Sequence, residues 1–242
     1  MQHHANATAP DLPWRSTDFD AALIDLDGTL VDTLDDFVEA VQRMLQDLDL
    51  PYREHLTHRA ELELLVGKGS ENLVRRLLAL VDSACATSAS PATIARALER
   101  YLAHYREVNG LKARVYDGAR AGLEQFKASG WRLACVTNKP TAYAQELLAK
   151  LRLDDYFSLV LGGDATERKK PDPMPLQKAC ATLGVLPART LMVGDSSNDA
   201  QAARAAGCPV LLVTYGYNHG EDIRSVDADA FAGTLSGLRW KA

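Results

Sequence analysis

From Gly118 onward, short apolar runs alternate with segments in which apolar residues recur at helical spacing. The apolar runs cover residues 133–136, 159–161, 190–193 and 210–213. The segments with helical spacing cover residues 142–151, 176–183 and 199–206. Nearly continuous apolar strands separated by helices are typical of a parallel sheet that is covered on both faces. We therefore expect an α/β fold with a Rossmann-like parallel-sheet core.

The stretch from Leu34 to about Arg114 has a different pattern, because its apolar residues recur at helical spacing and no strand is evident. Ser90 and Pro91 form a plausible N-cap and first turn for a helix within it. This pattern predicts an all-helical insert just after the first strand of the core. The expected division is a flexible N-terminal tail over 1–17, an α/β core over 18–33 and 114–242, and the helical insert over 34–113.

Composition argues against several classes of partner and compartment. The 242 residues carry a formal net charge of −5, which does not favour nucleic acid or an anionic membrane surface as a partner. The polar segment before Ser16 resembles neither a signal peptide nor a membrane span. Four widely spaced cysteines without a Cys-x-x-Cys pair are interpreted as small buried hydrophobes in a reducing compartment. We therefore expect a cytoplasmic protein, and oligomeric state is not readable from the chain.

The apolar run 21–24 leads directly into two carboxylates, Asp25 and Asp27, followed by a Gly-Thr turn. Two Asp residues at the end of a buried strand are costly unless a cation or hydrogen bonds hold them. In open parallel α/β sheets, chemistry takes place at the carboxyl ends of the strands. The run therefore predicts a metal-assisted catalytic site.

Three further segments carry polar residues suited to phosphate or metal binding. They are Thr137-Asn138-Lys139, Lys169-Lys170-Pro171-Asp172-Pro173 and Gly194-Asp195-Ser196-Ser197-Asn198-Asp199. The expected sheet would bring them close to Asp25, although they are far from it in sequence. Carboxylates, a hydroxyl and an ammonium together suit phosphoryl transfer, which depends mainly on positioning and charge stabilisation.

These residues, in this order, resemble the four motifs of the haloacid dehalogenase-like hydrolase superfamily. The motifs match Asp25-x-Asp27-Gly28-Thr29, Thr137-Asn138, Lys170-Pro171 and Gly194-Asp195-x-x-x-Asp199. The resemblance extends from Phe19 to Leu238, and the helical insert resembles the family's cap of the first type. Within the superfamily, the segments 133–140, 169–176 and 214–220 are most similar to those of the phosphoglycolate phosphatases.

The resemblance implies a Mg²⁺-dependent phosphomonoester hydrolase that acts through an aspartyl-phosphate. The expected substrate is 2-phosphoglycolate, a small molecule that would give glycolate and phosphate. Three alternatives stay open: a phosphatase for another small sugar or metabolite phosphate, a phosphomutase of the same fold, and a binding module without activity. A dehalogenase is disfavoured, because that branch lacks the second Asp of the first motif.

The resemblance also assigns roles to individual residues. Asp25 would attack phosphorus, and Asp27 would act as general acid and then as general base. The Mg²⁺ ligands would be the side chains of Asp25 and Asp195 and the backbone carbonyl of Asp27. Asp199 would act through water or orient the site, or it could simply cap a helix that starts near Asn198.

The remaining assignments concern the substrate. Thr137 and Asn138 would donate hydrogen bonds to the phosphoryl oxygens, and Lys170 would neutralise them. Lys139 is interpreted, with Lys169 and Arg168, as a competing solvated loop cation. Lys68, within Gly67-Lys68-Gly69-Ser70, would bind the substrate carboxylate if that segment is a specificity loop rather than a plain glycine turn.

Overall fold

The computed structural model describes residues 11–50, 58–83 and 89–242. Its strands are β1 (Ala21–Ile24), β2 (Val31–Asp32), β3 (Arg114–Val115), β4 (Arg132–Val136), β5 (Leu159–Leu161), β6 (Thr190–Gly194), β7 (Val210–Val213) and β8 (Ala230–Ala232). Its α-helices are α1 (Leu34–Asp47), α2 (Arg59–Glu63), α3 (Ser70–Ser83), α4 (Pro91–Val108), α5 (Ala119–Ala128), α6 (Thr141–Lys150), α7 (Met174–Leu183) and α8 (Ser197–Ala206).

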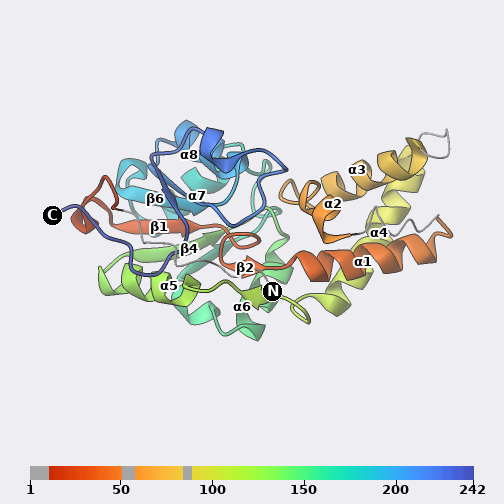
Figure 1. Ribbon diagram of the computed structural model, residues 1–242, viewed down its shortest axis with the longest axis horizontal. Helices are drawn as coiled ribbons and strands as arrows, with labels where there is room; N and C mark the ends of the chain where they lie inside the picture. The colour runs from red at the N-terminus through yellow and green to blue at the C-terminus, as the bar shows by residue number, and fades with distance from the viewer. Residues whose placement is uncertain (1–10, 51–57, 84–88) are drawn as a thin grey trace.

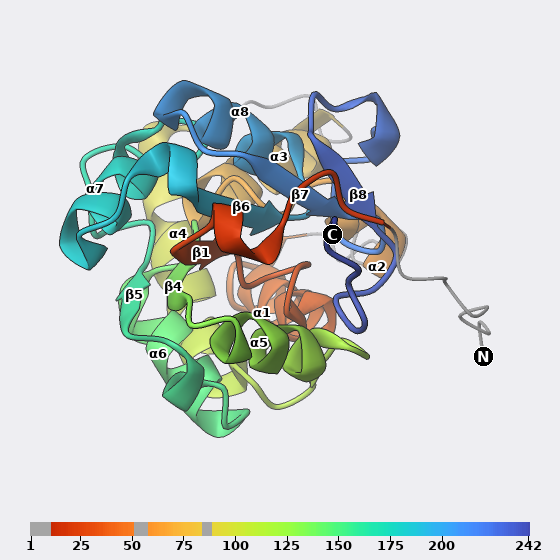
Figure 2. The same ribbon diagram turned by 90° about the vertical axis from the view of Figure 1, so that its left-hand side faces the viewer.

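Six strands form one parallel sheet in the order β5-β4-β1-β6-β7-β8. Helices α7 and α8 cover one face of this sheet, and α5 and α6 cover the other (Figure 1; Figure 2 shows the same layers from the end). The predicted α/β fold with a Rossmann-like core is therefore confirmed. All four apolar runs form strands of this sheet, and β8 joins them at one edge.

Alternation along the central strands explains why both faces are apolar. In β1, Ala22 and Ile24 belong to the buried cluster that includes residues of α5 and α6. The intervening Ala21 and Leu23 belong to the cluster that includes residues of α7 and α8. Because successive side chains of a strand point to opposite faces, a fully apolar run is what a sheet covered on both sides requires.

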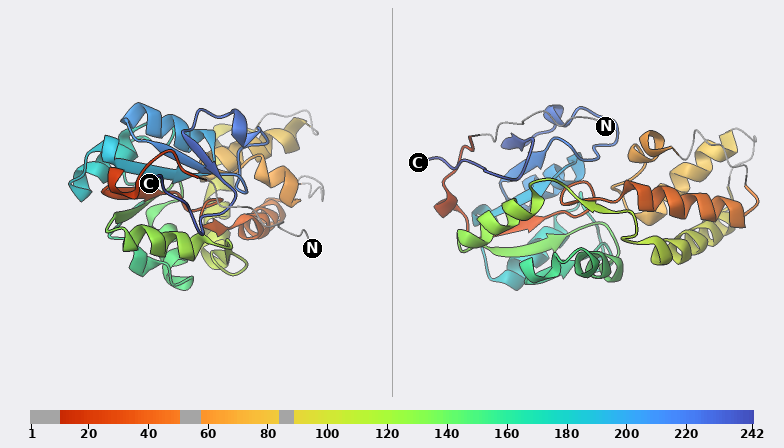
Figure 3. Two further views of the ribbon diagram at one scale, coloured as in Figure 1. Left: turned by 60° about the vertical axis from the view of Figure 1, so that its left-hand side comes forward. Right: turned by 60° about the horizontal axis from the view of Figure 1, so that its bottom comes forward.

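Helices α1 to α4 follow β2 and form a separate lobe beside the carboxyl ends of the sheet strands (Figure 3). The chain leaves the sheet region through β2 and returns through β3, and these two strands pair antiparallel. The lobe has its own buried cluster, whose largest fully buried side chains include Tyr101 and Tyr105. These four helices and the described loops between them lie within the predicted helical insert, and we keep that name for them.

Several local predictions are confirmed. The Ser90 side chain caps α4 by accepting a hydrogen bond from the Thr93 N–H at 3.1 Å. Gly184 and Gly207 end α7 and α8 in the left-handed conformation, which glycine adopts without a Cβ penalty. Cys135, Cys180 and Cys208 are buried thiols, whereas Cys85 and the polar tail before residue 11 lie outside the described residues.

Among the described residues, none of the helices combines the length and the apolar character that a membrane span requires.

Candidate active site

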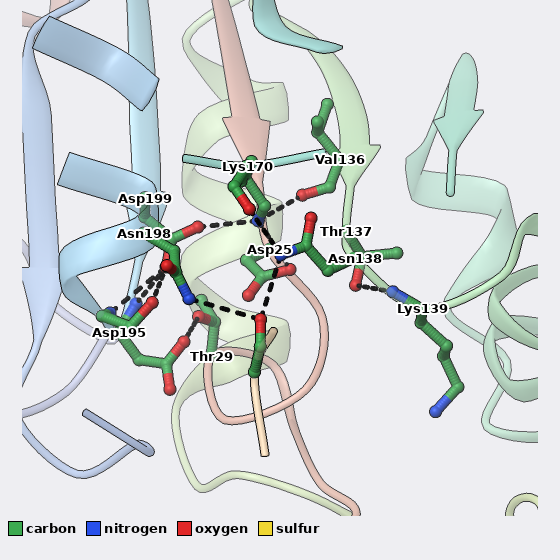
Figure 4. Close-up of polar contacts among 12 residues, drawn as sticks. Asp25, Thr29, Val136, Thr137, Asn138, Lys139, Lys170, Asp195, Asn198 and Asp199 are labelled. Carbon is green, nitrogen blue, oxygen red and sulfur yellow. Dashed lines mark hydrogen bonds and ion pairs between the residues drawn. The ribbon is translucent and has the colours of Figure 1, made fainter. Parts of the chain in front are cut away.

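Asp25 immediately follows β1, at the carboxyl end of the central strand of the sheet. Its backbone N–H donates to the Val193 carbonyl at 2.9 Å, which extends the pairing of β1 with β6 by one residue. Its Oδ1 lies 2.9 Å from the Lys170 Nζ, and its side chain is only 13 % exposed (Figure 4). The first carboxylate of the sequence run is thus buried and paired with the predicted motif lysine.

Asp195 and Asp199 approach Asp25 from the next strand of the sheet. Asp195 follows β6, and Asp199 lies in the first turn of α8. One carboxylate oxygen from each of the three acids can be chosen so that all three lie within 4.8 Å of one another. This cluster of hard oxygen ligands is the type that Mg²⁺ prefers in proteins.

The two acids differ in how their oxygens are held. Asp195 Oδ1 accepts from the Thr29 hydroxyl at 2.9 Å, and Oδ2 accepts from the Tyr217 N–H at 2.6 Å. Asp199 Oδ1 accepts from the Lys170 Nζ at 2.7 Å. Its Oδ2 accepts from the Ser196 N–H at 3.2 Å and from the Ser196 hydroxyl at 2.8 Å. Both oxygens of Asp199 are therefore committed to protein donors that fix Lys170 and the start of α8.

The first-motif turn needs its glycine. Gly28 has a φ of +89°, and a Cβ there would lie 2.1 Å from Asp195 Oδ2. Only a residue without a side chain lets the turn pass this close to the carboxylate at that backbone angle. The turn thereby closes one side of the acidic cluster.

Burial dominates the electrostatics of the cluster. Desolvation raises the pKa of Asp25 to about 6, against the opposing charge of Lys170. Desolvation, with the nearby charges of Asp199 and Asp25, also raises the pKa of Asp195 well above its ordinary value. Carboxylates whose ionised forms are disfavoured in this way gain stability when a cation joins them.

Lys170 is the centre of this arrangement. Burial alone would lower its pKa, but the charges of Asp199 and Asp25 reverse the effect and raise it. Its Nζ also donates to the Val136 carbonyl at the end of β4, at 2.7 Å. The ammonium is therefore charged and held between two acids and a strand end, beside the predicted nucleophile.

Asp27 lies in a second polar group that the sequence analysis did not recognise. Its Oδ1 accepts from the Thr33 hydroxyl at 2.8 Å and from the Lys139 Nζ at 3.0 Å. The Lys139 side chain is only 2 % exposed, so its interpretation as a solvated loop cation was wrong. Its place directly after Thr137-Asn138, in the loop at the strand end, is the signal that could have identified it.

Thr137 and Asn138 follow β4 and are both buried. The Thr137 Oγ1 accepts from the Lys139 N–H at 3.2 Å, which leaves its hydroxyl hydrogen uncommitted by that bond. The Asn138 Nδ2 donates to the carbonyls of Gly67 at 3.0 Å and Lys170 at 2.9 Å. The Asn138 amide thus links the loop that carries Lys170 to the helical insert. Both of its hydrogens are donated to these two carbonyls.

A cavity of about 40 Å³ lies between the sheet and the helical insert. The sheet side contributes Asp25, Asp27, Thr137, Asn138 and Lys139. The insert contributes Phe37, Val66, Gly67, Gly69, Ser70, Leu73, Tyr101 and Tyr105. The predicted carboxylate binder, Lys68, is exposed and is not among the lining residues, although its neighbours are. The cavity therefore combines the two acids of the first motif with a mainly apolar lid.

The sequence that forms this site matches a known protein family. The family model of the haloacid dehalogenase-like hydrolases matches residues 22–213 of the chain. The chain belongs to this family. The match spans both the α/β core and the helical insert, so the family assignment made from the four motifs is confirmed.

Similar proteins of this hydrolase family include phosphoglycolate phosphatases. That of Thiobacillus denitrificans is 43 % identical over 216 residues, covering 89 % of this chain and 92 % of the relative. A plasmid-encoded one of Cupriavidus necator is 44 % identical over 218 residues, with 90 % of each chain covered. The crystal structure of a predicted phosphoglycolate phosphatase from Haemophilus somnus has a TM-score of 0.82 and 33 % identity, covering 88 % of this chain and 94 % of that one.

Proposed function

We propose that this hydrolase is a phosphatase that converts 2-phosphoglycolate into glycolate and phosphate. The observation that carries the proposal is the cavity, which joins Asp25 and Asp27 under the helical insert. The 43–44 % identity to phosphoglycolate phosphatases over about nine-tenths of the chain supports the same substrate. The small cavity favours a small leaving group, over which the insert can act as a closed cap.

Asp25 is the proposed nucleophile. Attack of a carboxylate oxygen on phosphorus would form an aspartyl-phosphate and release the leaving-group oxygen. Lys170, whose Nζ lies 2.9 Å from Asp25 Oδ1, would neutralise the phosphoryl oxygens as charge moves onto them. The Thr137 hydroxyl lines the same cavity and would donate a hydrogen bond to one of those oxygens.

Asp27 is the proposed general acid and base. Once protonated, it would give its proton to the departing alkoxide, and the resulting carboxylate would accept a proton from the water that cleaves the aspartyl-phosphate. Thr33 and Lys139 hold the carboxylate in a defined orientation for both steps. Asn138 supports the site by holding Lys170 and Gly67, since its amide hydrogens are committed to their carbonyls.

The acidic cluster suits Mg²⁺. The oxygens of Asp25 and Asp195 are close enough to share one cation, and burial disfavours their ionised forms, so a cation bound there would stabilise them. We propose these two side chains, with the backbone carbonyl of Asp27, as its ligands. Asp199 would instead fix Lys170, because its Oδ1 pairs with the Lys170 ammonium, whereas the donors to Asp195 are a neutral hydroxyl and a backbone N–H. When bound, Mg²⁺ would reduce the repulsion between the carboxylate and the anionic phosphate.

The proposal is tested by measuring phosphate release from a panel of small phosphorylated compounds with Mg²⁺. The panel contains 2-phosphoglycolate, β-glucose 1-phosphate, 3-phosphoglycerate, pyrophosphate and p-nitrophenyl phosphate. We expect 2-phosphoglycolate to give the highest kcat/KM. A panel led by a hexose phosphate would overturn this substrate and leave a phosphatase of different specificity.

The same experiment separates a phosphatase from a phosphomutase of the same fold. A phosphatase transfers the phosphoryl group to water, so inorganic phosphate accumulates. A phosphomutase returns it to the sugar, so an isomeric sugar phosphate accumulates instead. Detection of glucose 6-phosphate from β-glucose 1-phosphate, without release of phosphate, would favour the phosphomutase.

A further inference from the structure

The charged side chains of the cavity wall are few. Among its described lining residues, two are acidic, Asp25 and Asp27, and one is cationic, Lys139. Most of the wall contributed by the helical insert is apolar or aromatic. An anionic group that enters beside the phosphoryl site therefore meets a positive charge at Lys139.

The Lys139 ammonium is held in place by contacts from both lobes. Its Nζ lies 3.0 and 3.3 Å from the two oxygens of Asp27. On the other side it hydrogen-bonds the Tyr105 hydroxyl and lies 4.6 Å from the centre of the Tyr105 ring and 5.1 Å from that of Phe37. Lys139 thus lies between the proposed general acid and the aromatic wall of the insert.

The geometry of the leaving group connects Asp27 with Lys139. To be protonated by Asp27, the leaving-group oxygen must lie within hydrogen-bond reach of that carboxyl. In glycolate a single methylene carbon separates this oxygen from the carboxylate. The carboxylate must therefore lie close to Asp27, where the Lys139 Nζ is the neighbouring cation.

We propose that Lys139 is a specificity-determining residue that binds the carboxylate of the substrate leaving group. This inference rests on the proposed function and replaces Lys68, which is exposed and outside the cavity lining. A carboxylate that loses its hydration needs a paired cation, and the pair is stronger where water is excluded. The rings of Phe37 and Tyr105 provide that exclusion on the insert side.

The test compares two substrates of nearly equal size on the complete Mg²⁺-loaded enzyme. One is 2-phosphoglycolate, and the other is 2-hydroxyethyl phosphate, which carries a hydroxymethyl group in place of the carboxylate. Lys139→Gln removes the charge but keeps hydrogen-bond donors for Asp27 and Tyr105. We expect it to lower the ratio of the two kcat/KM values about 100-fold, the range seen when one partner of a buried charge pair is lost.

Three further variants make the comparison specific. Lys139→Arg keeps the charge and should retain most of the substrate ratio. Lys68→Gln and the remote, exposed Lys127→Gln should leave the ratio unchanged. Thermal unfolding checks that Lys139→Gln folds. If it does not, the ratio of the two kcat/KM values is measured in Lys139→Met instead.

The possible failures are distinguishable. Wild-type enzyme that does not hydrolyse 2-phosphoglycolate would reject the proposed function. Wild-type enzyme that hydrolyses it, combined with equal losses for both substrates in Lys139→Gln, would reject only carboxylate binding and leave Lys139 as a positioning residue for Asp27. If Lys68→Gln instead lowered kcat/KM for 2-phosphoglycolate more than for 2-hydroxyethyl phosphate, Lys68 would be the residue that binds the carboxylate.

Discussion

At the scale of single residues, Asp25 and Asp195 are acids whose burial disfavours their charge. Desolvation raises the pKa of Asp25 to about 6 and that of Asp195 well above its ordinary value, from an unfolded-state value of about 3.9. Their stability contribution is therefore complete below about pH 4 and is lost as the pH rises through the folded-state pKa values. Thermal unfolding in EDTA should therefore show a Tm that falls from about pH 4 to about pH 6 as Asp25 ionises.

Mg²⁺ should reverse this trend, since metal ligands must be deprotonated. We expect Mg²⁺ to raise the Tm more at pH 7.5 than at pH 5. Asp195→Asn should weaken that increase, whereas the exposed Asp155→Asn should not. An equal effect of Mg²⁺ at both pH values would mean that these acids do not form its site.

Sequence patterns identified the acids of the site better than its cations. An Asp at the end of an apolar strand is unusual enough to indicate a function, so Asp25 and Asp195 were found at once. A lysine in a polar loop has the same sequence signature whether it is buried or solvated. Lys139 was therefore interpreted as solvated, with its place directly after Thr137-Asn138 as the one contrary signal, whereas the packing of Phe37 and Tyr105 shows that its ammonium is enclosed.

At the scale of elements, a buried acid ties the first helix of the insert to the returning chain. Asp36 in α1 accepts hydrogen bonds from the Gly110 N–H at 2.7 Å and the Lys112 N–H at 2.8 Å. Both donors lie just before β3, which pairs with β2 at the junction of the two lobes. The bonds therefore set where the chain re-enters the core.

Asp36→Ala removes the acceptor for both N–H groups. We expect the free energy of unfolding to fall by about 2 kcal/mol, the range for lost hydrogen bonds to a charged group. The matched control is Asp35→Ala, one residue earlier on the same helix. Asp35 is exposed and forms a surface ion pair with Arg59, so its loss should cost under about 1 kcal/mol. Equal losses in urea unfolding would contradict this account of the junction.

Element prediction succeeded for runs of strongly apolar residues and failed for weaker or shorter ones. The runs that became β4, β6 and β7 have four or five residues that are almost all buried, and the three-residue run of β5 is Leu-Val-Leu. By contrast, β8 has two alanines around one phenylalanine, and β2 and β3 have two residues each. Such short strands depend on their partners, which the local sequence does not show.

At the scale of the whole molecule, one carbonyl of the insert accepts hydrogen bonds from two side chains of the core. Gly67 O of the insert accepts from Asn138 Nδ2 at 3.0 Å and from Asn198 Nδ2 at 3.3 Å. Asn198 also contacts His219 Nε2 at 3.1 Å. Two core segments that are distant in sequence therefore hold Gly67 of the insert over the cavity, and His219 supports one of them.

Asn198→Ala should weaken this closed arrangement without removing a catalytic group. We expect kcat/KM for 2-phosphoglycolate to fall about 5-fold, the equivalent of one hydrogen bond of about 1 kcal/mol. Gln201→Ala, on an exposed position of the same helix, is the control. Unchanged kinetics in both variants would show that this contact does not contribute to closure.

The central claim is that Asp25 is phosphorylated during turnover, and acid-quenched enzyme tests it most directly. Enzyme mixed with 2-phosphoglycolate labelled in its phosphoryl group should carry label that hydroxylamine removes, as expected for an acyl-phosphate. Peptide mapping should place the label on Asp25. The Asp25→Asn variant should carry none and should lose more than about 10³-fold in kcat while still unfolding in a cooperative transition. Label on another residue, or near-normal turnover in folded Asp25→Asn enzyme, would contradict the mechanism.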